Sequence, residues 1–277
     1  MHTKKILLAF VAIATLVGAV VFTSTSDVFA QTSDAKNKSD YSSRTSNGPQ
    51  DNSAIQWVST GETATTVDDG ENAYTTSFRT EDCTFNSTGR NPFFILEPNY
   101  QLVLVGEEDG EEVVLTITVL NETREVNGTE TRIVEERESV AGELVEISRN
   151  FFAICEETNS VFYFGEEVDD YENGRIVGHE GAWLAGENNS RAGIIMPGTV
   201  LLGARYYQEV APDVALDRAE IIEMDAQVET PAGSFTNVVV VRETTPLEPN
   251  VEEFKYHVAG IGLIQDANLK LVEYGFI

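Results

Sequence analysis

Residues 113–120 read VVLTITVL, a run in which β-branched and aliphatic side chains follow one another without a charge. The apolar side chains at 113, 115, 117 and 119 would share one face of an extended strand, because successive side chains of a strand point to opposite faces. An Asp-Gly pair at 109–110 precedes the run and an Asn-Gly pair at 127–128 follows it, and both pairs favour tight hairpin turns. The stretch therefore predicts a strand with antiparallel neighbours on both sides.

The same signals recur along the chain. Further strands are predicted at the apolar run 101–105, at the aromatic run 161–164 and at the four consecutive valines 238–241. Strands separated by hairpin turns are typical of a meander, whose sheet must curl or pair to hide its apolar face. We therefore expect a mainly β protein, with a curled antiparallel sheet or half-barrel that forms a single domain over residues 54–277.

Three segments are less regular. Residues 181–198 are rich in glycine and polar residues and are expected to form a long loop that carries Trp183. Residues 244–250 contain two prolines and are expected to connect two strands. Residues 215–224 can be placed on helical spacing, but a strand is the favoured interpretation.

The N-terminus predicts export. A short basic start is followed by an uncharged apolar run at 6–22 and by small residues before Ala30. This pattern is typical of a secretory signal peptide over residues 1–30, and the alternative is an uncleaved membrane anchor. Residues 31–53 contain no large aliphatic residue, so they are expected to form a disordered linker. The predicted location is secreted or in the cell envelope, with contact to a membrane only through an uncleaved N-terminal segment.

The charge is strongly acidic. The formal net charge is −28 and the isoelectric point is about 4.3. Such a chain repels nucleic acid, because phosphate binding needs clustered lysines and arginines. It would attract cations to its surface, although an acidic composition that serves only solubility is the alternative.

Two cysteines, Cys83 and Cys155, remain in the predicted mature chain. Cysteines in an oxidising compartment most often pair, and this bridge would stabilise the fold by roughly 4 kcal/mol in the chain-entropy description. Two buried thiols are the alternative, because Phe85 lies near Cys83 and the apolar residues 151–154 precede Cys155.

Asn-x-Ser/Thr acceptor sites for glycosylation are also present. They lie in stretches that are predicted to be loops, turns or strand ends, where a glycan could attach in a host with the machinery. The candidates are Asn37, Asn86, Asn121, Asn127 and Asn188.

The sequence predicts no catalytic, metal-binding or cofactor-binding residue. His179 is expected to be a solvated strand-end residue and His257 a strand-paired one, since neither lies in a zinc-binding spacing. Cys155 with one of these histidines would make a nucleophile pair, but no local signature supports that alternative. The chain also has no serine in a nucleophile-elbow motif.

Acidic runs are too frequent to identify a site. The run 166–170 is expected to be a solvated strand end, and the acidic loops at 68–72 and 107–112 are expected to be plain turns. The first of these loops fails the EF-hand spacing, because Gly70 falls where an acidic ligand is required. Paired carboxylates indicate catalysis only when they are rare or buried.

Eight phrases of the chain resemble an uncharacterised family of secreted bacterial and archaeal proteins. The resemblance covers about residues 83–265 and implies no particular activity or catalytic residue. The phrases are NPFFILEP (91–98), NSVFYFGEEV (159–168), GAWLAG (181–186), AGIIMPG (192–198), YYQEVAPDVALDRAE (206–220), VETPAGSF (228–235), TTPLEPN (244–250) and KYHVAGIGLI (255–264).

A more distant likeness concerns the fold. The phrase TPAGSF (230–235), followed by VAGIGLI (258–264), is similar to LolA-like envelope proteins, which imply a strongly curved sheet that holds acyl chains. We therefore expect a non-enzymatic exported protein that binds an apolar or amphiphilic ligand, a lipid among the candidates. The alternatives are a structural or adhesive acidic protein that binds cations or neighbouring proteins, and a hydrolase with an unrecognised site.

Overall fold

The computed structural model describes residues 73–277. The predicted signal peptide (1–30), the predicted linker (31–53), Asn37 and the acidic loop at 68–72 lie outside these residues. The described part is built almost entirely from strands, joined by turns and one short 3₁₀ helix, η1 (Thr80–Asp82). No helix within it is long and apolar enough to cross a membrane. The prediction of a mainly β protein is confirmed.

The strands, in chain order, are β1 (Phe85–Asn86), β2 (Gly89–Asn91), β3 (Phe94–Leu96), β4 (Tyr100–Glu108), β5 (Glu111–Val126), β6 (Thr129–Val140), β7 (Glu143–Cys155), β8 (Val161–Glu172), β9 (Arg175–Gly178), β10 (Trp183–Leu184), β11 (Arg191–Met196), β12 (Arg205–Tyr207), β13 (Glu209–Val210), β14 (Arg218–Thr230), β15 (Gly233–Thr245), β16 (Glu248–Val258), β17 (Gly262–Asp266) and β18 (Leu269–Phe276).

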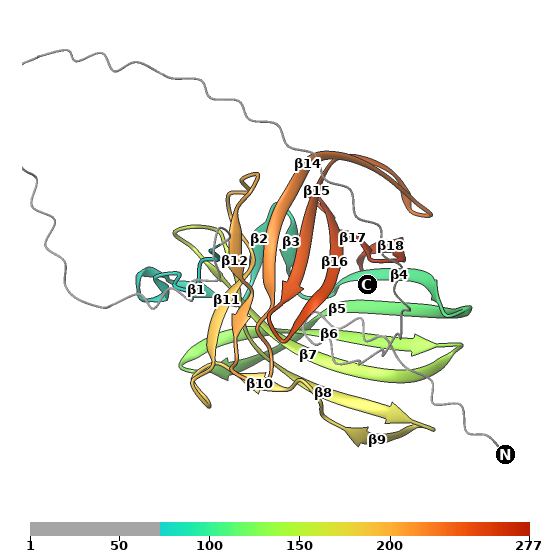
Figure 1. Ribbon diagram of the computed structural model, residues 1–277, viewed down its shortest axis with the longest axis horizontal. Helices are drawn as coiled ribbons and strands as arrows, with labels where there is room; N and C mark the ends of the chain where they lie inside the picture. Colours follow the sequence, from blue (N-terminus) through green and yellow to red (C-terminus); the bar gives the residue numbers. More distant parts are fainter. Residues whose placement is uncertain (1–72) are drawn as a thin grey trace, which may run out of the picture. The chain divides into compact units, whose positions relative to one another are not determined.

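Sixteen of these strands belong to one antiparallel sheet, and β2 and β3 form a separate ribbon. The main path runs in the order β12-β14-β15-β16-β17-β18-β4-β5-β6-β7-β8-β11-β13. Figure 1 shows β4 to β8 side by side, with β14 to β16 crossing them steeply after the sheet has turned at β17 and β18. The two ends of the path approach each other where β11 lies beside β12. The predicted curled sheet or half-barrel is therefore confirmed.

The alternating run at 113–120 forms the middle of β5. Its side chains Val113, Leu115, Ile117 and Val119 are all buried, whereas the intervening residues are half-buried. Leu115 pairs with Leu104 of β4 on one side and with Glu138 of β6 on the other. Consequently β6 brings carboxylates onto the same concave face that β5 fills with aliphatic side chains.

Aromatic side chains of β7, β8 and β10 fill another part of the core. Phe152 of β7 stacks on Tyr163 of β8 with ring centres 4.9 Å apart, and Trp183 meets Tyr163 edge-on at 5.2 Å. All three are at most 5% exposed. Stacked and edge-on pairs of this kind stabilise a core beyond the area that they bury.

The predicted long loop at 181–198 is wrong in part, because it contains β10 and β11, which pair with β8. The glycines that suggested a loop serve close packing instead. A Cβ atom on Gly193 would lie 2.5 Å from the carbonyl oxygens of Tyr207 and Gln208, so only glycine lets these backbones approach each other. Trp183, expected on that loop, is buried.

The connection predicted at 244–250 is also shorter than expected. β15 continues to Thr245 and β16 begins at Glu248, with an irregular register between them. Pro249 therefore lies at the start of a strand, a place where proline is tolerated. The helical alternative for 215–224 is wrong, because β14 covers these residues from Arg218 onward.

Cys83 and Cys155 form the predicted disulfide, with Cα atoms 5.1 Å apart. The bridge links the segment after η1 to the end of β7, and the two cysteines are 72 positions apart in the sequence. The alternative of two free thiols is wrong. The candidate glycosylation sites that the structure describes are exposed: Asn86, Asn121, Asn127 and Asn188.

Candidate functional site

A cavity of about 60 Å³ lies on the concave side of the sheet. Its walls come from β4, β5 and β6 on one side and from β15, β16 and β17 on the other, with Phe94 and Ile95 of β3 closing it. Phe93, Phe94 and Ile261 at its edge are only half-buried. The curl of the sheet creates the cavity, because strands that are far apart along the sheet face each other across it.

Most of the cavity wall is apolar. The aliphatic side chains that line it include Leu102, Ile117, Val134, Val241 and Leu263. They lie on the buried face of their strands, because successive side chains of a strand point to opposite faces. The volume suits a few water molecules or a small organic group, and it is far below the several hundred Å³ of a drug-sized pocket. An acyl chain of a membrane lipid would not fit inside without movement of the walls.

One end of the cavity is polar. Glu136, Glu243, Lys255 and His257 all line it. The Nζ atom of Lys255 lies 3.2 Å from a carboxyl oxygen of Glu243 and 3.4 Å from one of Asp266, so one ammonium is shared by two carboxyl groups. An apolar cavity with a few convergent polar groups is the usual form of a small-molecule site.

Glu136 is the most unusual of these groups. Its side chain is on the concave face of β6, and the residue is 3% exposed. Neither carboxylate oxygen has a hydrogen-bond partner among the described residues. Desolvation raises the pKa of Glu136 from 4.5 to about 8, although the attraction of Lys255 opposes the rise. The group is therefore mostly a neutral acid at pH 7, with a proton to donate.

His257 and Lys255 take opposite charge states. Burial, together with repulsion from Lys255, lowers the pKa of His257 to about 3, so this imidazole is neutral. Burial alone would also lower the pKa of Lys255, but the attraction of Asp266, Glu243, Glu253 and other carboxylates raises it well above its usual value. The polar end thus offers a permanent cation, a neutral acid and a neutral imidazole.

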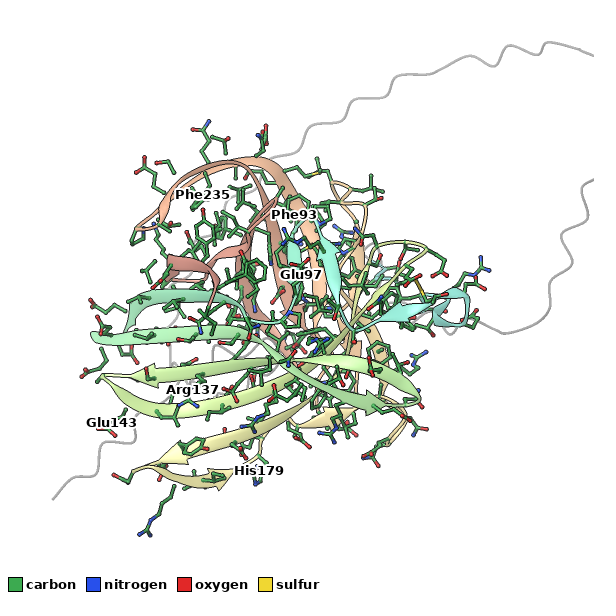
Figure 2. The ribbon with its side chains drawn as sticks, turned by 180° about the vertical axis from the view of Figure 1, so that it is seen from behind. Phe93, Glu97, Arg137, Glu143, His179 and Phe235 are labelled. Atoms are coloured by element: carbon green, nitrogen blue, oxygen red, sulfur yellow. A yellow bond between two sulfur atoms is a disulfide. The ribbon has the colours of Figure 1, made fainter. Side chains whose placement is uncertain are left out.

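The predicted strand-paired His257 is confirmed, since it pairs with Val239 and Leu263. The predicted strand-end His179 is also confirmed, because its side chain is 65% exposed and lies near Asp169 at the β8–β9 end of the sheet (Figure 2). The nucleophile alternative for Cys155 is excluded, because its sulfur is in the disulfide.

The acidic run 166–170 is not a uniformly solvated strand end. Glu167 is exposed, but Glu166 is only 1% exposed and lies opposite Asn150 on the concave face. The reason is an irregularity in β8 beside Gly165, where φ is +142° and a Cβ atom would lie 2.4 Å from the carbonyl oxygen of Trp183. The bulge shifts the alternation and turns Glu166 inward.

Among residues 73–277, the Cys, His, Asp and Glu side chains whose ligand atoms are close enough to share an ion are Cys83, Cys155 and Glu157. The two sulfurs are bonded to each other and are not thiolates, so this group is unsuited to a metal. The predicted acidic turn at 107–112 is shorter than expected: Asp109 and Gly110 form the turn, whereas Glu107 and Glu108 end β4 and pair with Glu111 and Glu112 of β5.

Glu136, Glu243 and Lys255 were not predicted as site residues. A usable signal was present in β16, where Glu253, Lys255 and His257 alternate and thus share one face. Three titratable side chains on the same face of a strand near the centre of a sheet must either be solvated or form a buried polar cluster. Which of the two holds depends on the curl of the sheet, which local pattern does not show.

The fold and the cavity define an antiparallel β-sheet protein with a partly polar interior cavity. Comparisons of the chain with protein-family models, with curated proteins and with solved structures found no match. The resemblance to a family of secreted proteins and the likeness to LolA-like proteins therefore stay predictions.

Proposed function

We propose that this chain is an exported, non-enzymatic protein that binds a small amphiphilic ligand in the concave cavity. The observation that supports it best is the combination of apolar walls with the buried, unpartnered carboxyl group of Glu136. A ligand hydroxyl or carbonyl oxygen would accept a hydrogen bond from the protonated Glu136. Export rests on the pattern of residues 1–30.

The ligand chemistry follows from the size and polarity of the cavity. The apolar part must be short or must extend past Phe93, Phe94 and Ile261, which border the cavity and are half-buried. A hydroxyl or carbonyl head fits better than an ionised head, because burying an unpaired charge costs far more free energy than burying a hydrogen-bonded neutral group. A medium-chain alcohol is the simplest probe with these properties.

We expect 1-butanol, 1-hexanol and 1-octanol to bind the purified mature chain with affinities that first rise with chain length and then level off. Each methylene that enters the cavity should improve Kd about four-fold, since burying it contributes about 0.8 kcal/mol. Titration calorimetry would measure this series. Exchange of Glu136→Leu should weaken every member, because the leucine side chain has no hydrogen-bond donor for the alcohol oxygen.

Two further variants distinguish binding in the cavity from binding at the surface. Glu143→Gln changes an exposed carboxylate at the end of the β6–β7 hairpin (Figure 2) and should leave the series unchanged. Ile117→Phe would fill the cavity and should abolish binding while thermal unfolding shows an intact fold. Equal binding by wild type and Ile117→Phe would contradict the proposed site.

A hydrolase is the second candidate, and the raised pKa of Glu136 is the observation that favours it. A carboxylic acid that keeps its proton near pH 7 can act as a general acid. We expect any slow turnover of p-nitrophenyl acetate by the wild type to be lost in Glu136→Gln and kept in Glu143→Gln. Equal rates for all three proteins and for buffer would remove this candidate.

The alternative of an acidic structural or adhesive protein that binds cations also stays open as a proposal. It rests on the net charge of −28. In that case the affinity for cations would fall as the ionic strength rises, and it would be the same in the wild type and in the cavity variants.

A further inference from the structure

A pocket of about 610 Å³ opens beside the disulfide and shares no lining residue with the concave cavity. Its walls come from the segment 76–85, from residues 127–130 at the turn between β5 and β6, and from the start of β11. The bridge between Cys83 and Cys155 ties the first of these walls to β7. The volume lies in the range of small-molecule sites, so the pocket is large enough for an organic ligand.

The apolar side chains that line this pocket are mostly aromatic. Phe78 and Phe85 are half-buried, and Phe164 of β8 is 4% exposed. The ring of Phe85 meets that of Phe164 edge-on, with ring centres 5.1 Å apart, and Ala185 and Ala192 lie at the same pocket. Edge-on packing stabilises the positions of the rings, so the pocket presents an apolar surface without any rearrangement.

One cation at the pocket has no partner in the protein. The side chain of Arg191, the first residue of β11, is exposed and forms no ion pair or hydrogen bond with any residue of 73–277. The other arginine at the pocket, Arg79, pairs with Asp82. Most arginines in this part of the chain likewise form ion pairs with carboxylates. Arg191 is therefore a guanidinium that an external anion can reach.

Two acidic residues also line the pocket, Glu81 and Glu130. A carboxylate oxygen of Glu130 accepts a hydrogen bond from Ser87 Oγ at 2.8 Å, so this side chain is already held within the protein. Glu81 is exposed on η1. Repulsion between exposed charges is screened by salt, so these residues lower the affinity for an anion but leave the guanidinium of Arg191 free to bind it.

We propose that this pocket binds a small organic carboxylate, whose apolar or aromatic body packs against Phe78 and Phe85 and whose carboxylate pairs with Arg191. The planar guanidinium group matches a carboxylate through two parallel hydrogen bonds. An inorganic anion suits the pocket less well, because it leaves the aromatic side chains uncovered. A neutral alcohol suits it less well too, because it leaves Arg191 without an ionic partner.

The test compares benzoate with benzyl alcohol, which has the same ring but no charge, by titration calorimetry on the purified mature chain at pH 7. Benzoate should bind about ten-fold more tightly, because hydrogen bonds to charged groups are stronger than neutral ones. Arg191→Gln should remove that difference. Arg175 of β9 is also exposed and unpaired within the described residues and does not line the pocket, so Arg175→Gln is the matched control and should leave both affinities unchanged.

A second variant tests the charge at the rim. Glu81→Gln removes an acidic group that lines the pocket and should tighten benzoate binding while leaving benzyl alcohol unchanged. Thermal unfolding of each variant would show that it folds, as expected for substitutions of exposed residues.

Four results would overturn the proposal: equal affinities of benzoate and benzyl alcohol, benzoate binding that survives Arg191→Gln, phosphate binding as tight as that of benzoate, and no detectable binding of benzoate. Ile117→Phe, which fills the concave cavity, should leave benzoate binding unchanged, and Arg191→Gln should leave the alcohol series at that cavity unchanged. The failure of one site can therefore be told from the failure of the other.

Discussion

Replacing Lys255 with methionine is expected to destabilise the fold by about 3–5 kcal/mol at pH 8, the usual cost of removing one partner from a buried ion pair. The side chain of Lys255 is 4% exposed and lies between Glu243 and Asp266. Methionine keeps a similar length and apolar stem, so the loss would come from the charge rather than from a cavity. Urea denaturation of the mature chain would measure it.

The size of this loss should depend on pH. Lys255 lowers the pKa of Glu136 and of Glu253, so its removal lets both carboxyl groups hold their protons to higher pH. At pH 5 the carboxyl groups left behind can become neutral at little cost, and the destabilisation should be smaller than at pH 8. Lys270→Met removes an exposed lysine of β18 and should change stability by less than about 1 kcal/mol. Equal losses for the two variants would show that Lys255 does not hold the cluster together.

Local pattern was sufficient for much of the fold. The alternation in β5 and the Asn-Gly and Asp-Gly turns describe interactions between residues close in sequence, and these formed as predicted. Residues 191–196 were missed because their strand character comes from pairing with β8, and Gly193 fits a close backbone contact rather than a turn. Contacts with residues distant in sequence determine the secondary structure of this segment, and the local sequence pattern does not show those contacts.

The candidate site was hidden for a related reason. Its polar groups come from β6, β15 and β16, which meet only because the sheet curls back on itself. In an acidic chain each carboxylate is individually unremarkable, and the sequence does not tell which ones the curl will bury. Glu166 is an example, because one bulge beside Gly165 moved it from the expected exposed face to the interior.

The free energy of unfolding of the wild type is expected to fall as the pH rises from 5 to 8, and Glu136→Gln should remove the part of that fall that Glu136 contributes. The pKa of Glu136 is about 8 in the folded chain and near 4.5 when unfolded. Between these values the folded chain binds more protons than the unfolded chain, so the slope of stability against pH is negative. The penalty from Glu136 alone at pH 8 is of the order of 4 kcal/mol. Burial also raises the pKa values of Glu146, Asp217 and Glu253 to about 7, so these groups add to the fall.

Urea denaturation at pH 5, 6.5 and 8 would test this directly. Exposed carboxylates have finished titrating by about pH 6, so a further loss between pH 6.5 and 8 must come from groups with raised pKa values. Glu136→Gln should be more stable than the wild type at pH 8 and close to it at pH 5, whereas the exposed control Glu143→Gln should follow the wild type throughout. A wild-type stability that stays level or rises from pH 6.5 to 8 would mean that Glu136 is ionised in the folded chain, and the neutral acid on which the proposed ligand site rests would then be lost.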